Sequence, residues 1–258
     1  GLLDRAEDAL NRLEGTPFEA QARLALLAIY ERSRDWSHAA SIAQKMHAAD
    51  QGDFSTRQAH YLCEQALALS VQGDRAGAKA LLEQAIAAAP DAARARIELA
   101  RLQQLMGQPD AVLATLQTLG ERAPAALPLA APLMVEAGNA TGRQAEVLAR
   151  LVAHYEQSPS LDVLESIVAM EAANDATQAT ARARYVQHLD KERSLVAAAK
   201  WLSAEKLEHE EFHPQIQRAL EHAVKPLTRY RCAACGFEAR QHFWQCPGCQ
   251  TWDSYPAR

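Results

Sequence analysis

Four of the five cysteines in this 258-residue sequence fall within eighteen positions, as two C-x-x-C pairs. The pairs are Cys232 with Cys235 and Cys246 with Cys249. A zinc or iron ion in a tetrahedral site binds four thiolates, and one tight C-x-x-C turn can supply two of them. The alternative is two disulfides, which would need an oxidising compartment. The spacing favours a tetra-cysteine metal site with these four residues as ligands.

The residues around each pair favour turns in which backbone N–H groups point back at the first sulfur. Gly236 and Gly248 permit unusual backbone dihedral angles, and Pro247 fixes one φ angle. Gln250 stands where a second glycine would make the two turns alike, so we expect slight strain there. Sites with four sulfur ligands accept both iron and zinc, so the sequence leaves the metal open.

Aromatic side chains gather around the same cysteines. Six of the fifteen aromatic residues follow Lys225, namely Tyr230, Phe237, Phe243, Trp244, Trp252 and Tyr255. A segment of about 30 residues buries too little surface to fold alone. A bound metal that contributes roughly 10–16 kcal/mol can fold it around such rings. We therefore expect a small metal-dependent domain over residues 225–258.

The rest of the chain contains an internal repeat of 34 or 35 residues. The sequence is rich in Ala and Leu, 48% hydrophobic and only 6% aromatic, which favours helices over strands. Three copies share a glycine, a small residue, a leucine and a proline: Gly73, Ala78, Leu82 and Pro90; Gly107, Val112, Leu116 and Pro124; Gly142, Val147, Leu151 and Pro159. A weaker later copy is Asn174, Ala179, Ala183 and Val186. An earlier copy, Arg34, Ala39, Ala43 and Met46, fits if about five residues are inserted near Gln51–Ser55.

Each copy predicts two antiparallel helices that resemble a tetratricopeptide repeat. The glycine ends the first helix, the small residue lets the second helix approach closely, and the proline ends the second helix. The predicted fold is an all-α solenoid of helical hairpins with a small C-terminal rubredoxin-like metal knuckle. We expect a remnant helix of a truncated repeat at 1–18 and about five repeats at 19–191. Capping helices (195–207 and 215–224) and a linker follow at 192–224, and the metal domain occupies 225–258.

Enzyme signatures are weak in this sequence. Residues 209–213 read HEEFH, which matches the H-E-x-x-H motif of zinc peptidases. Pro214 disfavours helical geometry at His213, the flanking residues are polar, and no third ligand follows, so we expect an exposed acidic linker. No phosphate-binding loop, dinucleotide-binding motif or nucleophile elbow is present. The net charge of −5 argues against nucleic acid as the main partner.

Helical repeats that precede YRCAACGF (230–237) and WQCPGC (244–249) resemble the lipopolysaccharide assembly protein B family. The opening GLLDRAED and the segment YLCEQALA (61–68) strengthen the resemblance. The resemblance implies a Gram-negative inner-membrane protein, anchored by one N-terminal helix that precedes this sequence, with its repeats in the cytoplasm. It implies the same four cysteines as metal ligands, a rubredoxin-like unit packed against the repeats, and no catalytic residue.

The family also implies a function. Its members are adaptors without enzymatic activity that promote degradation of the LpxC deacetylase by the membrane protease FtsH. The resemblance implies other lipopolysaccharide-assembly membrane proteins as further partners. An electron-transfer rubredoxin module fused to a scaffold is the alternative, but the ten-residue gap between the pairs is shorter than in true rubredoxins. Residues from Lys225 onward carry a net charge of +3, which leaves −8 for the preceding chain. We therefore expect the metal knuckle to dock on the helices as a structural clasp, with help from Trp244 or Trp252.

Overall fold

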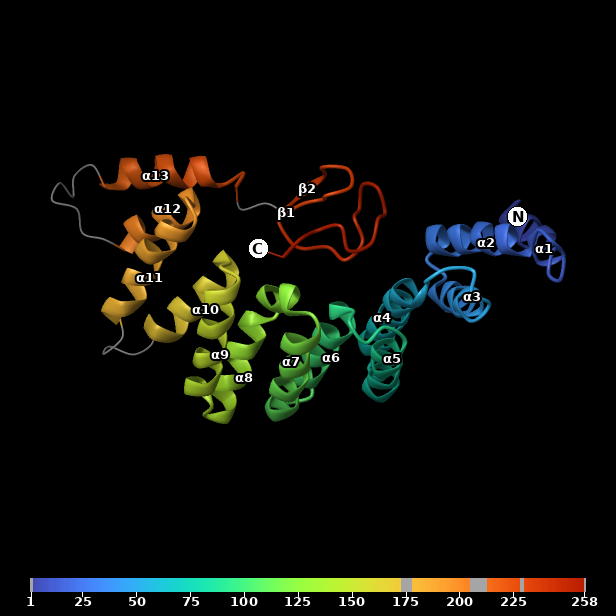
Figure 1. Ribbon diagram of the computed structural model, residues 1–258, viewed down its shortest axis with the longest axis horizontal. Coiled ribbons are helices and arrows are strands. Elements are labelled where there is room, and N and C mark those ends of the chain that lie inside the picture. Colours follow the sequence, from blue (N-terminus) through green and yellow to red (C-terminus); the bar gives the residue numbers. More distant parts are fainter. Residues whose placement is uncertain (1, 173–177, 205–212, 228–229, 258) are drawn as a thin grey trace. The chain divides into compact units, whose positions relative to one another are not determined.

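The protein, seen here in a computed structural model, consists mainly of helices, most of them in hairpin pairs, followed by a small non-helical C-terminal segment (Figure 1). The structure describes residues 2–172, 178–204, 213–227 and 230–257. Within those ranges, no helix is both long enough and apolar enough to cross a membrane. The chain divides into two compact units, residues 1–123 (the N-terminal unit) and residues 124–258 (the C-terminal unit).

The N-terminal unit contains a single helix followed by three helical hairpins, each pairing two consecutive helices. Its elements are α1 (Leu2–Asn11), α2 (Glu19–Ser33), α3 (Trp36–Ala48), α4 (Ser55–Val71), α5 (Arg75–Ala88), α6 (Ala93–Leu105) and α7 (Pro109–Arg122). The predicted turn residues adopt left-handed backbone conformations: φ is 57° at Arg34, 91° at Gly73 and 69° at Gly107. This geometry confirms the predicted end of the first helix in each hairpin.

The predicted small residues are buried near the start of the second helix of each hairpin. Ala39, Ala78 and Val112 are all completely buried near the start of α3, α5 and α7. Six residues, 49–54, separate α3 from α4, and Asp50 and Gly52 there have positive φ angles. The connection is two residues longer than the one between α5 and α6 (89–92), and α4 is the longest helix of the unit. The extra residues predicted between the first two hairpins are thus shared between the connection and α4.

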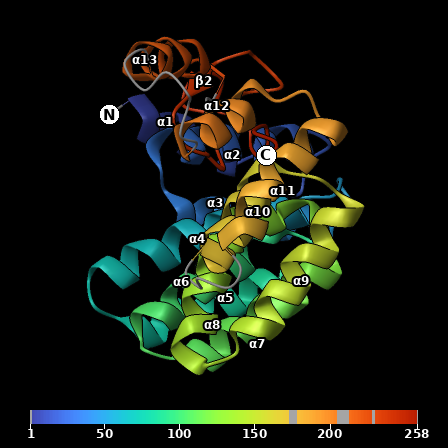
Figure 2. The same cartoon turned by 90° about the vertical axis from the view of Figure 1, so that its left-hand side faces the viewer.

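The C-terminal unit continues the helical hairpins and ends in the knuckle. Its elements are η1 (Pro124–Leu129), α8 (Ala131–Thr141), α9 (Gln144–Gln157), α10 (Leu161–Ala172), α11 (Gln178–Lys191), α12 (Leu195–Ala204), α13 (His213–Val224), β1 (Tyr230–Arg231) and β2 (Glu238–Ala239). Helices α8 and α9 pack side by side, as Figure 1 and Figure 2 both show. Gly142 ends α8 with a φ of 69°, and Pro159 follows the end of α9, as the sequence predicts.

A glycine in α8 makes room for the valine that begins the packing of α9. Val147 occupies the position held by Ala39, Ala78 and Val112 in earlier hairpins, and it is 3% exposed. A methyl group added to Gly138 would lie 2.8 Å from Cγ2 of Val147. The helices therefore approach closely because the glycine on α8 makes room for the valine on α9.

The predicted burial pattern of α11 is wrong. Val186 is 44% exposed and Ala183 is also exposed, whereas Ala181 and His188 are buried. Polar contacts determine the buried face: Nδ1 of His188 lies 2.6 Å from the Tyr155 hydroxyl, and Arg184 makes a two-pronged ion pair with Glu171 of α10. The other residues of this weak copy, Asn174 and the side chain of Ala179, lie outside the described residues.

The two capping helices are present as α12 and α13, although residues 205–207 of the first predicted helix lie outside the described ranges. Helix α13 begins at His213, two residues earlier than expected. Pro214 is compatible with this start because the first turn of a helix does not use that N–H group. The remainder of the H-E-x-x-H match, residues 209–212, lies outside the described residues.

Candidate metal centre

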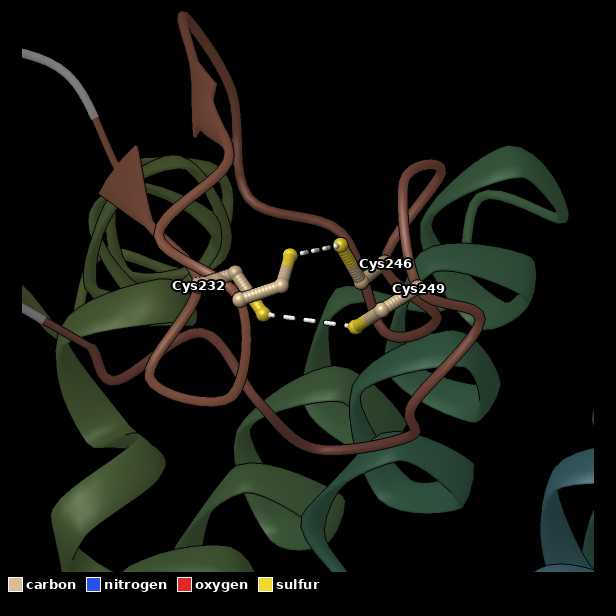
Figure 3. A group of neighbouring side chains, drawn as sticks. Cys232, Cys246 and Cys249 are labelled. Carbon is tan, nitrogen blue, oxygen red and sulfur yellow. Dashed lines mark hydrogen bonds between the residues drawn. The ribbon is translucent and has the colours of Figure 1, made fainter.

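The four cysteines of the predicted site come together in one cluster (Figure 3). Strands β1 and β2 pair antiparallel, with Tyr230 opposite Ala239, and this ribbon carries the first C-x-x-C turn. All four sulfur atoms lie within 4.8 Å of one another. The Sγ atoms of Cys232 and Cys249 are 3.8 Å apart, and those of Cys235 and Cys246 are 3.7 Å apart. Each close pair thus joins one C-x-x-C turn to the other.

These sulfur separations fit a tetrahedral metal site. Metal–sulfur bonds of about 2.3 Å in a tetrahedron place the sulfurs about 3.8 Å apart. A disulfide requires a sulfur–sulfur distance of about 2.05 Å, and all five cysteines are free. The structure therefore contradicts the disulfide alternative, and the four cysteines form a metal-binding knuckle for one ion.

The two C-x-x-C turns have matching backbone geometry. The Gly236 N–H donates to the Cys232 carbonyl at 2.9 Å, and the Gln250 N–H donates to the Cys246 carbonyl at 2.8 Å. The Gly248 N–H points at the Cys246 sulfur at 3.4 Å, as expected for a turn that binds a thiolate. Gly236 has a φ of 77° and Gln250 a φ of 61°. The strain predicted at Gln250 is thus present.

The four neighbouring sulfur atoms affect one another's ionisation. The pKa of Cys232 is lowered to about 6, chiefly because the Ser254 side chain hydrogen-bonds to its sulfur. The Phe237 N–H favours the thiolate of Cys235, but burial and the three neighbouring sulfurs outweigh it and raise that pKa to about 12. One thiol ionises easily while another resists, because four thiolates at this distance repel one another. A bound metal ion removes that repulsion.

The apolar core of the knuckle is small. It consists of Cys232, Ala239, Cys246 and Tyr255, with Tyr230 and Phe243 packed against it. The Tyr255 hydroxyl donates to the Phe237 carbonyl at 3.2 Å and lies 3.7 Å from the Cys246 sulfur. Burial is the main reason that the pKa of Tyr255 is raised. So few buried residues support the expectation that folding of this segment depends on metal.

A hydrogen bond joins the knuckle to the helices of its own unit. The hydroxyl of Tyr230, in β1, donates to Oδ2 of Asp162 in α10 at 3.2 Å. Asp162 lies in the first turn of α10, where a negative charge also interacts favourably with the helix dipole. The resemblance implied that the metal domain packs on the repeats, and this contact involves a tyrosine that the sequence did not single out for docking.

Two family models match parts of the chain. Residues 230–255 match the rubredoxin metal binding domain, and residues 72–136 match the tetratricopeptide repeat. Lipopolysaccharide assembly protein B of Escherichia coli K12 is 26% identical over 260 residues, which cover 98% of this chain and 67% of that protein. The chain is similar to lipopolysaccharide assembly protein B over nearly its whole length. Lipopolysaccharide assembly protein B of Haemophilus influenzae is 25% identical over 280 residues, covering 98% of this chain and 65% of that protein.

Solved structures of helical-repeat proteins align with the chain at low sequence identity. YrrB, described as a tetratricopeptide repeat protein with an unusual peptide-binding site, is 18% identical, with 76% of this chain and 97% of YrrB covered at a TM-score of 0.45. MamA is 14% identical, and the alignment covers 68% of this chain and 93% of MamA at a TM-score of 0.44. The tetratricopeptide assignment comes from the observed hairpins and the family match, since these scores are low.

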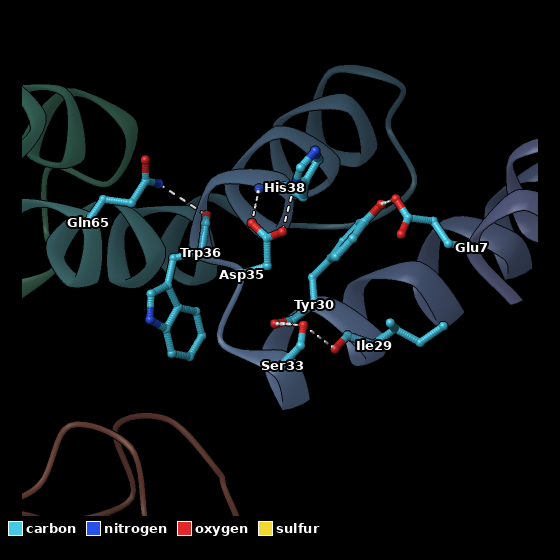
Figure 4. Close-up of polar contacts among 8 residues, drawn as sticks. All are labelled: Glu7, Ile29, Tyr30, Ser33, Asp35, Trp36, His38 and Gln65. Carbon is cyan, nitrogen blue, oxygen red and sulfur yellow. Dashed lines mark hydrogen bonds and ion pairs between the residues drawn. The ribbon is translucent and has the colours of Figure 1, made fainter. Parts of the chain in front are cut away.

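Sequence reasoning missed a series of polar contacts in the N-terminal unit. The Tyr30 hydroxyl contacts Glu7 (Figure 4), and the Tyr61 hydroxyl contacts Glu31. Arg94 makes the next contact, an ion pair with Glu64 of α4 at 2.6 Å. Tyr61 and Arg94 are 33 residues apart, as are Glu31 and Glu64. This spacing does not match the 34- or 35-residue repeat, so the repeat pattern did not predict these pairs. The Tyr61–Glu31 and Arg94–Glu64 contacts link the first helices of consecutive hairpins, and the Tyr30–Glu7 contact links α2 to the single helix α1.

Proposed function

We propose that this protein is an adaptor without enzymatic activity in the control of lipopolysaccharide assembly. The carrying observation is its similarity to lipopolysaccharide assembly protein B over 98% of the chain, including both the repeats and the knuckle. Helical-hairpin repeats present long surfaces that suit protein partners. The repeats at 19–191 bind the partners, and the segments at 1–18 and 192–224 complete and cap the solenoid.

The finer part of the proposal concerns the partners. They are the membrane protease FtsH and the LpxC deacetylase, together with other membrane proteins of lipopolysaccharide assembly. The adaptor promotes LpxC degradation at the cytoplasmic face of the inner membrane of a Gram-negative cell, and a single N-terminal helix anchors it there. Support comes from the names of the relatives, which tie them to lipopolysaccharide assembly, and from the family resemblance of the knuckle and repeats.

The proposed metal site uses Cys232, Cys235, Cys246 and Cys249 as the four ligands of one iron or zinc ion. The sulfur separations support this ligand set. The ion supplies a cross-link between the two turns, which the small apolar core cannot replace. In this proposal the knuckle is a structural clasp that shapes the repeats for their partner.

The test combines metal analysis with LpxC turnover. The variant is Cys246→Ser with Cys249→Ser, and the control is Cys63→Ala, which removes the buried cysteine of α4 outside the cluster. We expect one metal per chain in the parent and the control, and none in the double variant. In cells that lack their own adaptor, we expect the parent and the control to shorten the lifetime of LpxC and the double variant to fail.

Three outcomes would contradict the proposal. Four free thiols in metal-free purified parent protein would remove the metal site. Equal LpxC turnover with and without an intact knuckle would remove the clasp. A reversible iron couple in the parent, with LpxC turnover unaffected by the protein, would favour the electron-transfer alternative.

A further inference from the structure

A groove with a volume of about 750 Å³ lies among α3, α4 and α5 of the N-terminal unit. Its walls are the second helices of two consecutive hairpins: Ser41 and Gln44 face it from α3, and Gln84 from α5. Its floor is one face of α4, which carries Gln58, Leu62 and Gln65. None of the features described above accounts for this groove.

The groove is open because one helix separates two others. Helix α4 packs against both α3 and α5, so those two helices form opposite walls.

The lining is polar but almost free of charge. No Asp, Glu, Lys or Arg lines the groove, and His47 is its one titratable residue. The carboxamides of Gln44, Gln58 and Gln84 have no hydrogen-bond partner within the described parts of the chain. Gln65 differs, because its amide donates to the Trp36 carbonyl at 3.1 Å (Figure 4). Three carboxamides therefore remain free to bind a ligand.

The size and chemistry of the groove favour an extended peptide. The wall from Ser37 to Ala48 spans about 16 Å at 1.5 Å per helical residue, which is room for about five extended residues at 3.3 Å each. A carboxamide both donates and accepts, so it can bond to the unpaired N–H and C=O groups of an extended backbone. A helical ligand already satisfies those groups internally. A charged ligand side chain would lose water here without gaining an opposite charge.

We propose that this groove binds an uncharged, extended segment of a partner protein through hydrogen bonds from Gln44, Gln58 and Gln84 to its backbone. The inference rests on the adaptor function proposed above, because it assigns one docking point for a partner. Leu62 offers a small apolar contact on the floor for one side chain of the segment. The groove then recognises the extended backbone and the lack of charge of the partner segment more than its particular sequence.

The experiment pans a phage-displayed library of random heptapeptides against the whole chain. We expect the enriched peptides to lack Asp, Glu, Lys and Arg. The most enriched peptide is synthesised with blocked ends, and its affinity is measured by fluorescence anisotropy. Two further peptides are methylated on every second backbone nitrogen, one on the odd positions and the other on the even positions, which removes those N–H donors. We expect one of the two to bind at least tenfold more weakly than the unmethylated peptide.

The variant Gln44→Met with Gln84→Met keeps the side-chain length but removes the hydrogen-bonding groups. We expect it to lower the affinity for the peptide at least tenfold. The control, Gln117→Met with Gln157→Met, makes the same change at exposed positions of α7 and α9 and should bind like the parent. All four sites are exposed, so we expect unchanged helical circular dichroism. Equal binding by both variants, no enrichment, or enrichment of charged or helix-forming peptides would overturn the proposal.

Failure of this inference differs from failure of the adaptor function. If the groove variant loses the peptide but still shortens the lifetime of LpxC, the groove serves a partner other than LpxC. If the parent protein leaves LpxC turnover unchanged in the cell test above, the adaptor function fails whatever the peptide result.

Discussion

Gln250 shows how one side chain can carry a local cost inside the knuckle. Its φ of 61° places it in the left-handed region, which a side chain with a Cβ atom disfavours by about 1–2 kcal/mol. Gly236 takes the matching position in the other turn without that cost. The two N–H to carbonyl bonds that close the turns are nearly equal in length, so the geometry of the turn is maintained despite the strain.

We therefore expect Gln250→Gly to stabilise the metal-bound knuckle by about 1 kcal/mol, since the strain is larger than the added freedom of the unfolded chain. The reverse exchange, Gly236→Gln, should destabilise it by a similar amount. Both effects are measured as a change in the chelator midpoint, which is the chelator concentration that removes half of the metal. A lower chelator midpoint for Gln250→Gly than for the parent would contradict this account.

The buried His188 makes the C-terminal unit sensitive to acid. Its pKa is lowered, mainly by burial, although Glu192 nearby acts in the opposite direction. The Tyr155 hydroxyl, 2.6 Å from Nδ1, is the partner of the neutral ring. Below a pH of about 6.5 the unfolded histidine takes up a proton while the folded one stays neutral, so the free energy of unfolding falls as the pH decreases.

We expect amide hydrogen exchange in α9 and α11 to be faster at pH 5.5 than at pH 7.5, after correction for the intrinsic rates. His188→Gln keeps a hydrogen-bond acceptor for Tyr155 but cannot take up the proton, so it should reduce this difference. Equal pH dependence in the parent and the variant would show that His188 is not responsible.

Short-range signals in the sequence predicted much of the helical architecture and the cysteine cluster. Gly73, Gly107 and Gly142 mark turns because backbone conformation is a local property, and the C-x-x-C spacing likewise predicts two thiolates per turn. The register of α11 could not be predicted in this way. His188 and Arg184 are drawn inward by Tyr155 and Glu171 on other helices, and a single-helix pattern contains no information on those partners. The groove of α3, α4 and α5 depends on the spacing of three helices and was missed for the same reason.

The α8–α9 hairpin gives a prediction at the level of two packed elements. Gly138→Ala would place a methyl group 2.8 Å from Val147, so we expect a loss of roughly 1–3 kcal/mol in the stability of the C-terminal unit. Val147→Ala, which introduces the residue of the first two hairpins, should recover part of that loss in the double variant. Urea denaturation of the four proteins measures the coupling, and additive losses would show that the two residues do not compensate each other.

At the scale of the molecule, the knuckle and the helices are joined by contacts that single substitutions can test. Tyr230→Phe removes the hydroxyl that donates to Asp162, and we expect docking to weaken by about 1 kcal/mol with the metal retained. Limited proteolysis near residues 225–227 should then be faster. Tyr185→Phe, which removes a half-buried hydroxyl from α11, is the control and should be cleaved like the parent. Unchanged cleavage of Tyr230→Phe would show that this bond contributes nothing to docking.

The contact between Asp162 and Tyr230 also has a consequence for protein synthesis. The two residues are 68 positions apart, and a ribosome that adds 5–20 residues per second needs roughly 3–14 s to add the second after the first. The helical hairpins leave the ribosome before the cysteine cluster exists. A chain interrupted before Cys249 carries its helices but lacks a complete set of thiolates. The clasp can therefore form only on polypeptides whose translation has passed that codon, which makes metal capture a late checkpoint on a newly made chain.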